Sequence, residues 1–450
     1  NTQSRMAAVP ALSLRSGSPR LEQVAVLEGH TDRVWHAAWH PRAPLLATAS
    51  GDKTVRFWQP RSLAEPRDAR VAAAAAAGGA GDTPGGGYSS PAGAAAAAAA
   101  AAVPMTPTSP TTARSLASRV WRCVGSLADF TTRTVRCCEW SPDGRFLACT
   151  SFDGKAYVWA MVQVVEDDAP QFDESASAGP RELSLELAAT LEGHENEVKG
   201  CAWSSTGALL ATCGRDKSVW LWGMDEGGEG DMEVVAVLHG HSQDVKAVAW
   251  HPDRELLFSA SYDDTVRVWA DDGADWLCVA SLTGHTSTVW GLSFNASGSM
   301  LATVSDDCRV LLWAGSEPAR PSDVPPGVVD LLLYRRAGEV ADAHTRTIFT
   351  VDWTTPSESA ATASRHRELL ATAGADDAIH LYAPALPADT DATAGGGGAG
   401  GKDITIAPVA SRPHAHAQDI NCLRWHPRDT NLLVSTSDDG TAKLWRFHAQ

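Results

Sequence analysis

Histidine and aspartate recur as pairs along the chain, a combination that could serve a general base or a metal site. An imidazole held by a carboxylate can accept a proton from a substrate or bind a metal ion through its second nitrogen. Four pairs are separated by 22 residues: His30 with Asp52, His194 with Asp216, His241 with Asp263, and His285 with Asp307. Two looser pairs are His344 with Asp376 and His416 with Asp439. Because the pair repeats along the whole chain, we interpret it as structural and predict no catalytic residue and no metal ligand.

Other signs of catalysis are missing from the sequence. There is no P-loop, no G-x-S-x-G and no H-E-x-x-H motif. The nine cysteines are odd in number and include no C-x-x-C spacing. Cys137 and Cys138 are adjacent, so in a strand they point to opposite faces and cannot chelate together. The sequence therefore predicts a non-enzyme without a cofactor, whose thiols are free and reduced as in a cytosolic or nuclear protein.

Charge and hydropathy narrow the class of partner. The chain has 37 Lys and Arg against 54 Asp and Glu, a formal net charge of −17, which disfavours binding to a phosphate backbone. Its longest apolar stretches are alanine runs broken by glycine, not membrane-spanning segments. We therefore expect protein partners, and neither nucleic acid nor membrane.

Each His–Asp pair belongs to a longer repeat that occurs seven times. A Gly-His step is followed by an apolar segment, a hydroxyl residue four positions before the Asp, and a Trp six positions after it. The pattern resembles WD40 repeats, whose four-stranded blades join these side chains in one buried hydrogen-bond chain. The complete tetrads considered are His30, Thr48, Asp52 and Trp58; His194, Thr212, Asp216 and Trp222; His241, Ser259, Asp263 and Trp269; and His285, Thr303, Asp307 and Trp313. The predicted fold is all-β, a seven-bladed WD40 β-propeller.

Three copies of the repeat are degenerate. The second has Phe130 in place of His and Cys149 in place of the hydroxyl residue, and the sixth ends in Tyr382. The seventh is followed by only a few residues after Trp445, too few for an outer strand. The apolar segment Leu21 to Leu27 is predicted to supply that strand and so close the ring.

The predicted domain organisation follows from these boundaries. Residues 1–20 are expected to be a flexible extension, and residues 21–450 the propeller. Low-complexity inserts at 59–119 and 383–402 lack an apolar stripe and are expected to be disordered or weakly helical. In an up-and-down blade the long inserts all fall on one face, so the opposite, short-loop face is the candidate binding surface.

The short-loop face is predicted to carry aromatic and basic residues, the usual energetic anchors of protein interfaces. They occupy the start of the first strand of each blade and the position before the turn Asp. The predicted partner-binding residues are Arg33, Trp35, Arg136, Phe152, Lys199, Arg215, Lys246, Tyr262, Trp290 and Phe349. Alternatively, some of these rings pack into the central channel.

Three stretches go beyond the general repeat pattern and match one family more specifically. They are Leu191-Glu-Gly-His-Glu-Asn-Glu-Val-Lys199, Ala211-Thr-Cys-Gly-Arg-Asp-Lys-Ser-Val-Trp220, and Ser259-Ala-Ser-Tyr-Asp-Asp-Thr-Val266. With them the chain resembles the WD40 subunit of the cytosolic iron–sulfur protein assembly (CIA) targeting complex. The resemblance implies a scaffold that binds a small acidic-loop protein and a HEAT-repeat adaptor. It also implies that the complex delivers clusters to cytosolic and nuclear client apo-proteins, with the propeller as a monomer within it. The family's functionally important arginine matches Arg215.

Two other readings stay open. One is a substrate receptor for a cullin ubiquitin ligase or another peptide-binding scaffold, which the lack of any Trp-Asp dipeptide disfavours. The other is a cluster carrier that uses its own thiols. Leu333-Tyr334-Arg335 also spells a tripeptide used in iron–sulfur transfer, but we interpret it as ordinary packing in an outer strand.

Overall fold

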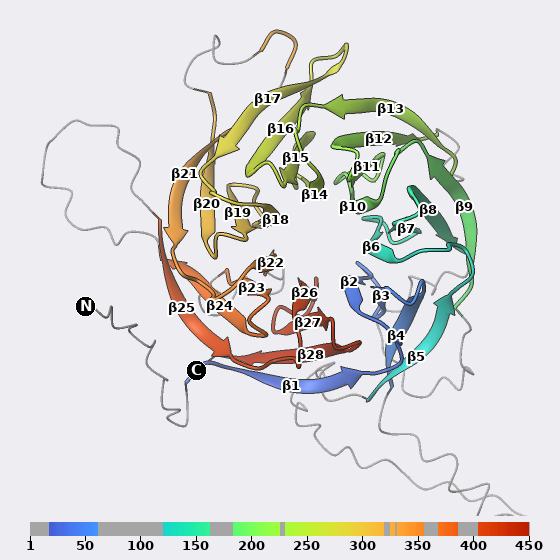
Figure 1. Cartoon of the computed structure of the whole chain (residues 1–450), viewed down its shortest axis with the longest axis vertical. Coiled ribbons are helices and arrows are strands. Elements are labelled where there is room, and N and C mark those ends of the chain that lie inside the picture. Colours follow the sequence, from blue (N-terminus) through green and yellow to red (C-terminus); the bar gives the residue numbers. More distant parts are fainter. Residues whose placement is uncertain are drawn as a thin grey trace, which may run out of the picture.

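The structure, a computed structural model, describes residues 18–61, 120–162, 183–225, 230–318, 325–328, 331–354, 368–385 and 404–449. Within these ranges the chain forms 28 strands, which assemble into seven antiparallel sheets of four strands. The sheets stand side by side around a central axis, with one strand of each sheet nearest the centre (Figure 1). The chain is therefore a seven-bladed β-propeller, which confirms the predicted fold class.

We letter the strands of a blade a to d from the centre outwards. The strands of the first three blades are β2 (Val34–Trp39), β3 (Leu46–Ser50), β4 (Val55–Arg61) and β5 (Val120–Leu127); β6 (Val135–Trp140), β7 (Phe146–Ser151), β8 (Lys155–Met161) and β9 (Leu185–Glu192); and β10 (Val198–Trp203), β11 (Leu209–Gly214), β12 (Ser218–Met224) and β13 (Met232–His239). Those of blades four and five are β14 (Val245–Trp250), β15 (Leu256–Ser261), β16 (Thr265–Asp271) and β17 (Trp276–Thr283); and β18 (Val289–Phe294), β19 (Met300–Ser305), β20 (Val310–Ser316) and β21 (Leu333–Val340). Those of blades six and seven are β22 (Ile348–Trp353), β23 (Leu370–Gly374), β24 (Ile379–Ala385) and β25 (Thr405–Arg412); and β26 (Ile420–Trp425), β27 (Leu432–Ser437), β28 (Ala442–His448) and β1 (Arg20–Leu27).

The seventh blade takes its outer strand from the beginning of the propeller. β1 pairs antiparallel with β28, from Arg20 opposite His448 to Leu27 opposite Ala442, and the two strands lie together at the rim (Figure 1). Leu21 and Leu27 are buried, while the residues between them are more exposed. The predicted closure of the last blade is confirmed. It leaves β28 with a partner on both sides and no free edge.

Neighbouring blades are joined by packing and by specific hydrogen bonds. Strand b of each blade is almost wholly buried, and strand c is about half buried, as expected where sheets are covered on both faces. The Trp that ends strand a donates its indole hydrogen to the preceding blade in three places: Trp39 to Arg424 O at 3.1 Å, Trp203 to Glu139 O at 3.2 Å, and Trp250 to Ala202 O at 3.0 Å. These bonds fix blades one, three and four relative to the blade that precedes each.

The long connections share one edge of the ring. The segments at 62–119, 163–182, 226–229, 319–330 and 386–403 join strands c and d, and 355–367 joins strands a and b. In an antiparallel sheet these ends lie on the same side, which leaves the b–c and d–a turns on the other. Residues 1–17 of the predicted extension and most of both predicted inserts lie outside the described residues. The described residues correct the boundaries slightly, because Arg20 already belongs to β1, β4 extends to Arg61 and β24 extends to Ala385.

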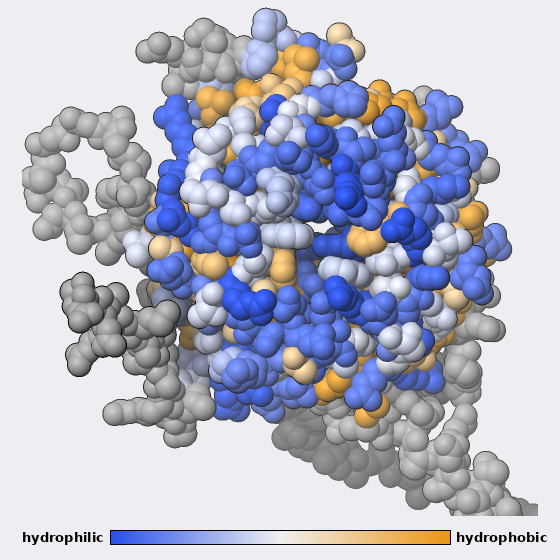
Figure 2. All heavy atoms as spheres, in the orientation of Figure 1, coloured by the Kyte–Doolittle hydropathy of each residue, from blue (hydrophilic) through white to orange (hydrophobic). Residues whose placement is uncertain are grey.

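The face turned towards the viewer in Figure 1 is mainly hydrophilic and is hollowed near the centre of the ring (Figure 2). In the described ranges no helix is long and apolar enough to cross a membrane. The tripeptide beginning at Leu333 opens the outer strand β21, where Tyr334 is buried and donates its hydroxyl hydrogen to Gly298 O. Tyr334 also packs edge-on against Phe258 and Phe294, which makes it a packing residue.

Candidate functional site

A bulge at the start of every strand a determines what lines the mouth of the channel. In β2, Val34 pairs with Ser50 and His36 with Ala49, so Trp35 is an extra residue without a partner in strand b. The same shift recurs in all seven blades. Bulges re-aim a side chain beside functional sites. The residues in the extra position are Trp35, Arg136, Lys199, Lys246, Trp290, Phe349 and Asn421.

The b–c turns hold the other predicted residues in one repeated geometry. In the third blade, the backbone N–H of Arg215 donates to Glu197 O at 2.9 Å. The residue after the turn Asp, here Lys217, has a positive φ of 70°, which tightens the turn. Equivalent bonds hold Phe152 and Tyr262 to the preceding loop. The side chain of Arg215 is 54% exposed and lies 3.6 Å from Glu197, so a rigid backbone presents a guanidinium that a partner can reach.

Most of the predicted residues line one cavity at the mouth of the channel. It has a volume of about 220 Å³ and is lined by Arg33, Trp35, Arg136, Phe152, Lys199, Lys246, Trp290, Phe349, Asp419, Asn421 and Asp438. Arg215 and Tyr262 lie outside this lining, on the b–c turns around it. The sequence therefore located a single surface, although it included neither its acidic members nor Asn421 among the predicted anchors.

Cations and aromatic rings alternate around this mouth. The guanidinium of Arg136 lies 4.8 Å from the centroid of the Trp35 ring. The ammonium of Lys199 lies 5.3 Å from the Phe152 ring, and that of Lys246 lies 4.9 Å from the Trp290 ring. Such contacts hold a cation over an aromatic face and are strengthened when water is excluded. The three rings are partly buried, and Trp290 also lines the deeper channel, where it packs edge-on against Phe349 with the ring centroids 5.1 Å apart. Trp290 and Phe349 therefore fit the alternative in which some rings pack into the channel.

Charge is divided unevenly around the mouth. Arg136, Lys199, Arg215 and Lys246 come from blades two to four, whereas Asp306, Asp419 and Asp438 come from blades five to seven. On the basic side, Glu197 lies 3.2 Å from Lys199 and 3.6 Å from Arg215, and Asp244 lies 3.4 Å from Lys246. Only the Arg215 side chain is largely exposed, so its ion pair has small energetic value. Burial, and then the nearby charge of Lys199, lower the pKa of Lys246. This crowding of cations favours a ligand that brings a carboxylate.

Five blades contain a complete hydrogen-bond chain beneath the turns. In blade three, His194 Nδ1 lies 2.7 Å from Asp216, His194 Nε2 lies 2.8 Å from the Thr212 hydroxyl, and the Trp222 indole donates to that hydroxyl at 2.9 Å. One proton arrangement satisfies every group if the histidine is neutral, with its hydrogen on Nδ1. Equivalent chains lie in blades one, four, five and seven, through Thr48, Ser259, Thr303 and Ser435.

Blades two and six are built differently. In blade two, Asp153 accepts hydrogen bonds from Thr131 at 2.6 Å and from Tyr157 at 2.7 Å, and Phe130 packs edge-on against the Tyr157 ring. Sequence reasoning missed these two substitutes, although Thr131 directly follows the lost histidine. In blade six, Tyr382 donates to Ala343 O at 3.2 Å instead of completing the chain.

Thermal stability is expected to fall as the pH drops below about 6.5. Burial lowers the pKa of His241 and His416 below 6.5, so in this range the unfolded chain binds protons that the folded chain does not. Their contribution to stability is complete above pH 6.5 and is lost as the pH falls. Thermal denaturation from about pH 7 down to about pH 4 measures this. A melting temperature that rises on acidification would contradict it, since only groups such as His36, with a raised pKa, act in that direction.

A second loss of folding stability is expected in stronger acid. Burial alone would raise the pKa of Asp216 and Asp376, but hydrogen bonds from His194 and His344 lower both to about 2, from 3.8. The stability that these carboxylates contribute is present above pH 3.8 and disappears as the pH falls through 2.

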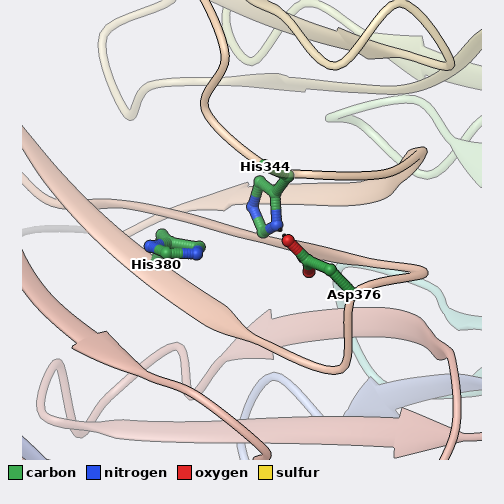
Figure 3. A group of neighbouring side chains, drawn as sticks. All are labelled: His344, Asp376 and His380. Atoms are coloured by element: carbon green, nitrogen blue, oxygen red, sulfur yellow. Dashed lines mark hydrogen bonds and ion pairs between the residues drawn. The ribbon is translucent and has the colours of Figure 1, made fainter. Parts of the chain in front are cut away.

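One group in the described part of the chain could offer three donor atoms to a metal ion within 4.8 Å of one another: His344, Asp376 and His380. Figure 3 shows the imidazole of His344 beside the Asp376 carboxylate, with the His380 ring approaching from the neighbouring strand. Both nitrogens of His344 are already bonded, to Asp376 at 2.9 Å and to Thr372 at 2.8 Å. A metal would have to break this chain, so the group is better explained as part of the blade.

Sequence reasoning also missed a charged layer deeper in the channel. Arg424 Nη2 lies 3.1 Å from Glu139 and 3.1 Å from His36 Nε2, which links blades seven, one and two. Asp352 accepts the backbone hydrogen of Trp425 at 2.7 Å, and burial raises the pKa of Asp352 to about 6. The sequence does carry a signal for this layer: a charged residue stands just before the Trp of strand a, at the position where blades one, three and four have alanine.

Comparison with known proteins agrees with this architecture. The family described as "WD domain, G-beta repeat" matches residues 21–59, 121–160, 185–223, 232–270, 276–314 and 408–446. The unmatched interval contains β21 to β24, including Tyr382 and the long connection at 355–367.

Several similar proteins have names that refer to cytosolic iron–sulfur assembly. A probable cytosolic iron–sulfur protein assembly protein, Ciao1, of Culex quinquefasciatus is 36% identical over 432 residues, 95% of this chain and 98% of its own length. A probable cytosolic Fe–S cluster assembly factor of Schizosaccharomyces pombe is 35% identical over 96% of this chain, which spans only 55% of that relative. An assembly protein of Vanderwaltozyma polyspora is 39% identical over 70% of this chain and 82% of its own. The chain belongs to the WD40-repeat family of cytosolic iron–sulfur protein assembly proteins.

Proposed function

We propose that this chain is a non-catalytic scaffold of cytosolic iron–sulfur protein assembly, which binds partner proteins at the mouth of its short-loop face. The observation that carries the proposal is the alternation of cations and aromatic rings around one cavity of about 220 Å³. Trp, Tyr and Arg in a desolvated, rigidly held cluster are typical of the centre of an interface. The names of the relatives supply the pathway.

The charge distribution indicates the chemistry of the partner. Most cations of the mouth come from blades two to four and most of its acids from blades five to seven. Glu197 and Asp244 lie among the cations, and Arg33 and Arg346 pair with Asp438 and Asp419. The remaining asymmetry favours one orientation for a segment that bears carboxylates. This fits the small acidic-loop subunit that the family resemblance implies, and leaves the remaining surface for a larger adaptor and for client apo-proteins. The word "cytosolic" in the relatives' names supports a cytoplasmic location, and a nuclear pool is part of the proposal.

Restoring function in living cells tests the proposal. In cells depleted of their own assembly scaffold, this chain is expected to restore the activity of a cytosolic iron–sulfur enzyme and to co-purify with other assembly proteins. The matched control is a mitochondrial iron–sulfur enzyme, whose activity should not change. A soluble, folded chain that restores nothing and co-purifies instead with ubiquitin-ligase subunits would overturn the proposal in favour of a substrate receptor. Stoichiometric iron and sulfide in the anaerobically purified chain would favour a cluster carrier.

A further inference from the structure

Two thiols from neighbouring blades meet beside the central channel. Cys137 lies in β6 and Cys201 in β10, and their sulfur atoms are 3.9 Å apart. Both residues are 4% exposed, and both line the channel, which has a volume of about 500 Å³. A disulfide requires the sulfurs to come within about 2.05 Å of each other, so the two side chains must move closer before they can be joined. No other pair of thiols in the described residues is recorded in such contact.

A buried histidine faces the same thiols. His36, in β2, is 7% exposed. Arg424 can only donate to His36 Nε2, at 3.1 Å, so in the neutral imidazole the hydrogen lies on Nδ1, and the protonated imidazole carries a hydrogen there as well. Within the described part of the chain this Nδ1 has no hydrogen-bond partner. Burial alone would lower the pKa of His36, but the charges of Cys137 and Cys422 raise it well above its usual value. The imidazole is therefore placed to stabilise a thiolate.

The two cysteines differ in character. The hydrogen bond from Cys201 lowers the pKa of Cys137 well below its usual value, whereas the same contact raises that of Cys201. Burial raises the pKa of Cys138 to about 11 and that of Cys149 well above its usual value. Sensor cysteines combine thiolate character, access to a small oxidant and a resolving thiol nearby. Cys137 has all three, because the channel gives access and Cys201 is in contact.

We propose that Cys137 and Cys201 form a reversible oxidation site for hydroperoxides, with Cys137 as the attacking thiol, Cys201 as the resolving thiol and His36 as the positioning residue. The Cys137 thiolate attacks one oxygen of the peroxide, the O–O bond breaks, and hydroxide or alkoxide leaves. The Cys201 sulfur then attacks the Cys137 sulfenic acid, the S–S bond forms, the S–O bond breaks, and the Cys201 proton leaves with the oxygen as water. Two thiols are oxidised to one disulfide, and hydrogen peroxide is reduced to two waters. The site does not depend on the proposed function.

Mapping of the wild-type chain tests the site directly. The reduced full-length protein is treated with a small excess of hydrogen peroxide, unfolded in N-ethylmaleimide to cap the remaining thiols, and digested without reduction. We expect a cross-linked peptide pair joining Cys137 to Cys201, which disappears after treatment with dithiothreitol. Fragmentation must place the link on Cys137 and not on Cys138. The proposal is overturned if Cys137 and Cys201 both carry the maleimide at a dose that oxidises the exposed Cys123 or Cys278.

Two variants assign the roles, and a third is the control. In Cys201→Ser the sulfenic acid on Cys137 is expected to persist and to be trapped by dimedone. In Cys137→Ser the Cys201 thiol is expected to remain reduced. Cys278→Ser, an exposed thiol in blade four, should leave the cross-link unchanged. The assignment would be overturned by a dimedone adduct on Cys201 in the Cys137→Ser variant together with no adduct on Cys137 in the Cys201→Ser variant. If either serine variant fails to fold, the wild-type mapping still decides.

Discussion

Replacing Asp216 with alanine is expected to lower the free energy of unfolding by about 1–3 kcal/mol. The carboxylate accepts hydrogen bonds from His194, from the backbone of Glu195, and from both the backbone and the hydroxyl of Ser218. The His194 side chain is only 2% exposed, so without Asp216 its Nδ1 hydrogen loses its partner where water cannot replace it. Thermal denaturation followed by circular dichroism measures the loss.

The control for Asp216→Ala is Asp253→Ala, which removes an exposed aspartate from the opposite side of the neighbouring blade. That change is expected to leave the melting temperature close to the wild-type value, as for most exposed positions. Equal melting temperatures for Asp216→Ala and the wild type would mean that the chain from His194 through Thr212 to Trp222 contributes nothing to stability.

Arg215→Glu is expected to weaken partner binding by roughly 30-fold, the effect of losing about 2 kcal/mol from an arginine that anchors an interface. The fold should survive, because the Arg215 side chain is 54% exposed and its ion pair with Glu197 is 3.6 Å long. The turn itself is held by backbone bonds and by Asp216, which the substitution leaves in place. Titration calorimetry with the acidic-loop subunit, alongside thermal denaturation, separates binding from stability.

The matched control is Arg122→Glu, the same charge reversal at an exposed position in the outer strand β5. It changes the net charge equally but lies away from the mouth, so binding should be unchanged. Equal weakening by both variants would show that net charge, and not the position of Arg215, governs association. Full binding by Arg215→Glu would remove Arg215 from the site.

The sequence predicted much of the fold because buried polar groups must satisfy one another. His194, Asp216 and Trp222 can share one hydrogen-bond chain only if their blade has a fixed shape, so their spacing in sequence encodes that shape. The b–c turns follow for the same reason, which is why Arg215 could be placed beside the mouth from its position before Asp216.

The rest of the site depends on contacts between blades, which spacing within one repeat does not encode. Cys137 is the third residue of its strand and Cys201 the fourth residue of the next blade's strand. Alternating side chains therefore point these two towards each other across the gap between sheets. Arg424 and Glu139, which contact each other, are 285 residues apart in the sequence. The bulge that leaves Arg136 without a partner in strand b is set by the pairing register of the two strands. None of these three features leaves a recognisable pattern within the sequence of one repeat.

The pairing of β1 with β28 also sets when the protein can finish folding during its synthesis. Arg20 leaves the ribosome long before His448, its partner in the sheet. At elongation rates of about 5–20 residues per second, β1 waits roughly 20–90 seconds for that partner. Until β28 has been synthesised, the hydrogen-bonding edge of β1 has no partner in its own sheet and is open to pairing with other chains. Nascent copies are therefore expected to need a chaperone most before β28 emerges, and a ribosome that stalls before β28 would release a propeller that is not closed.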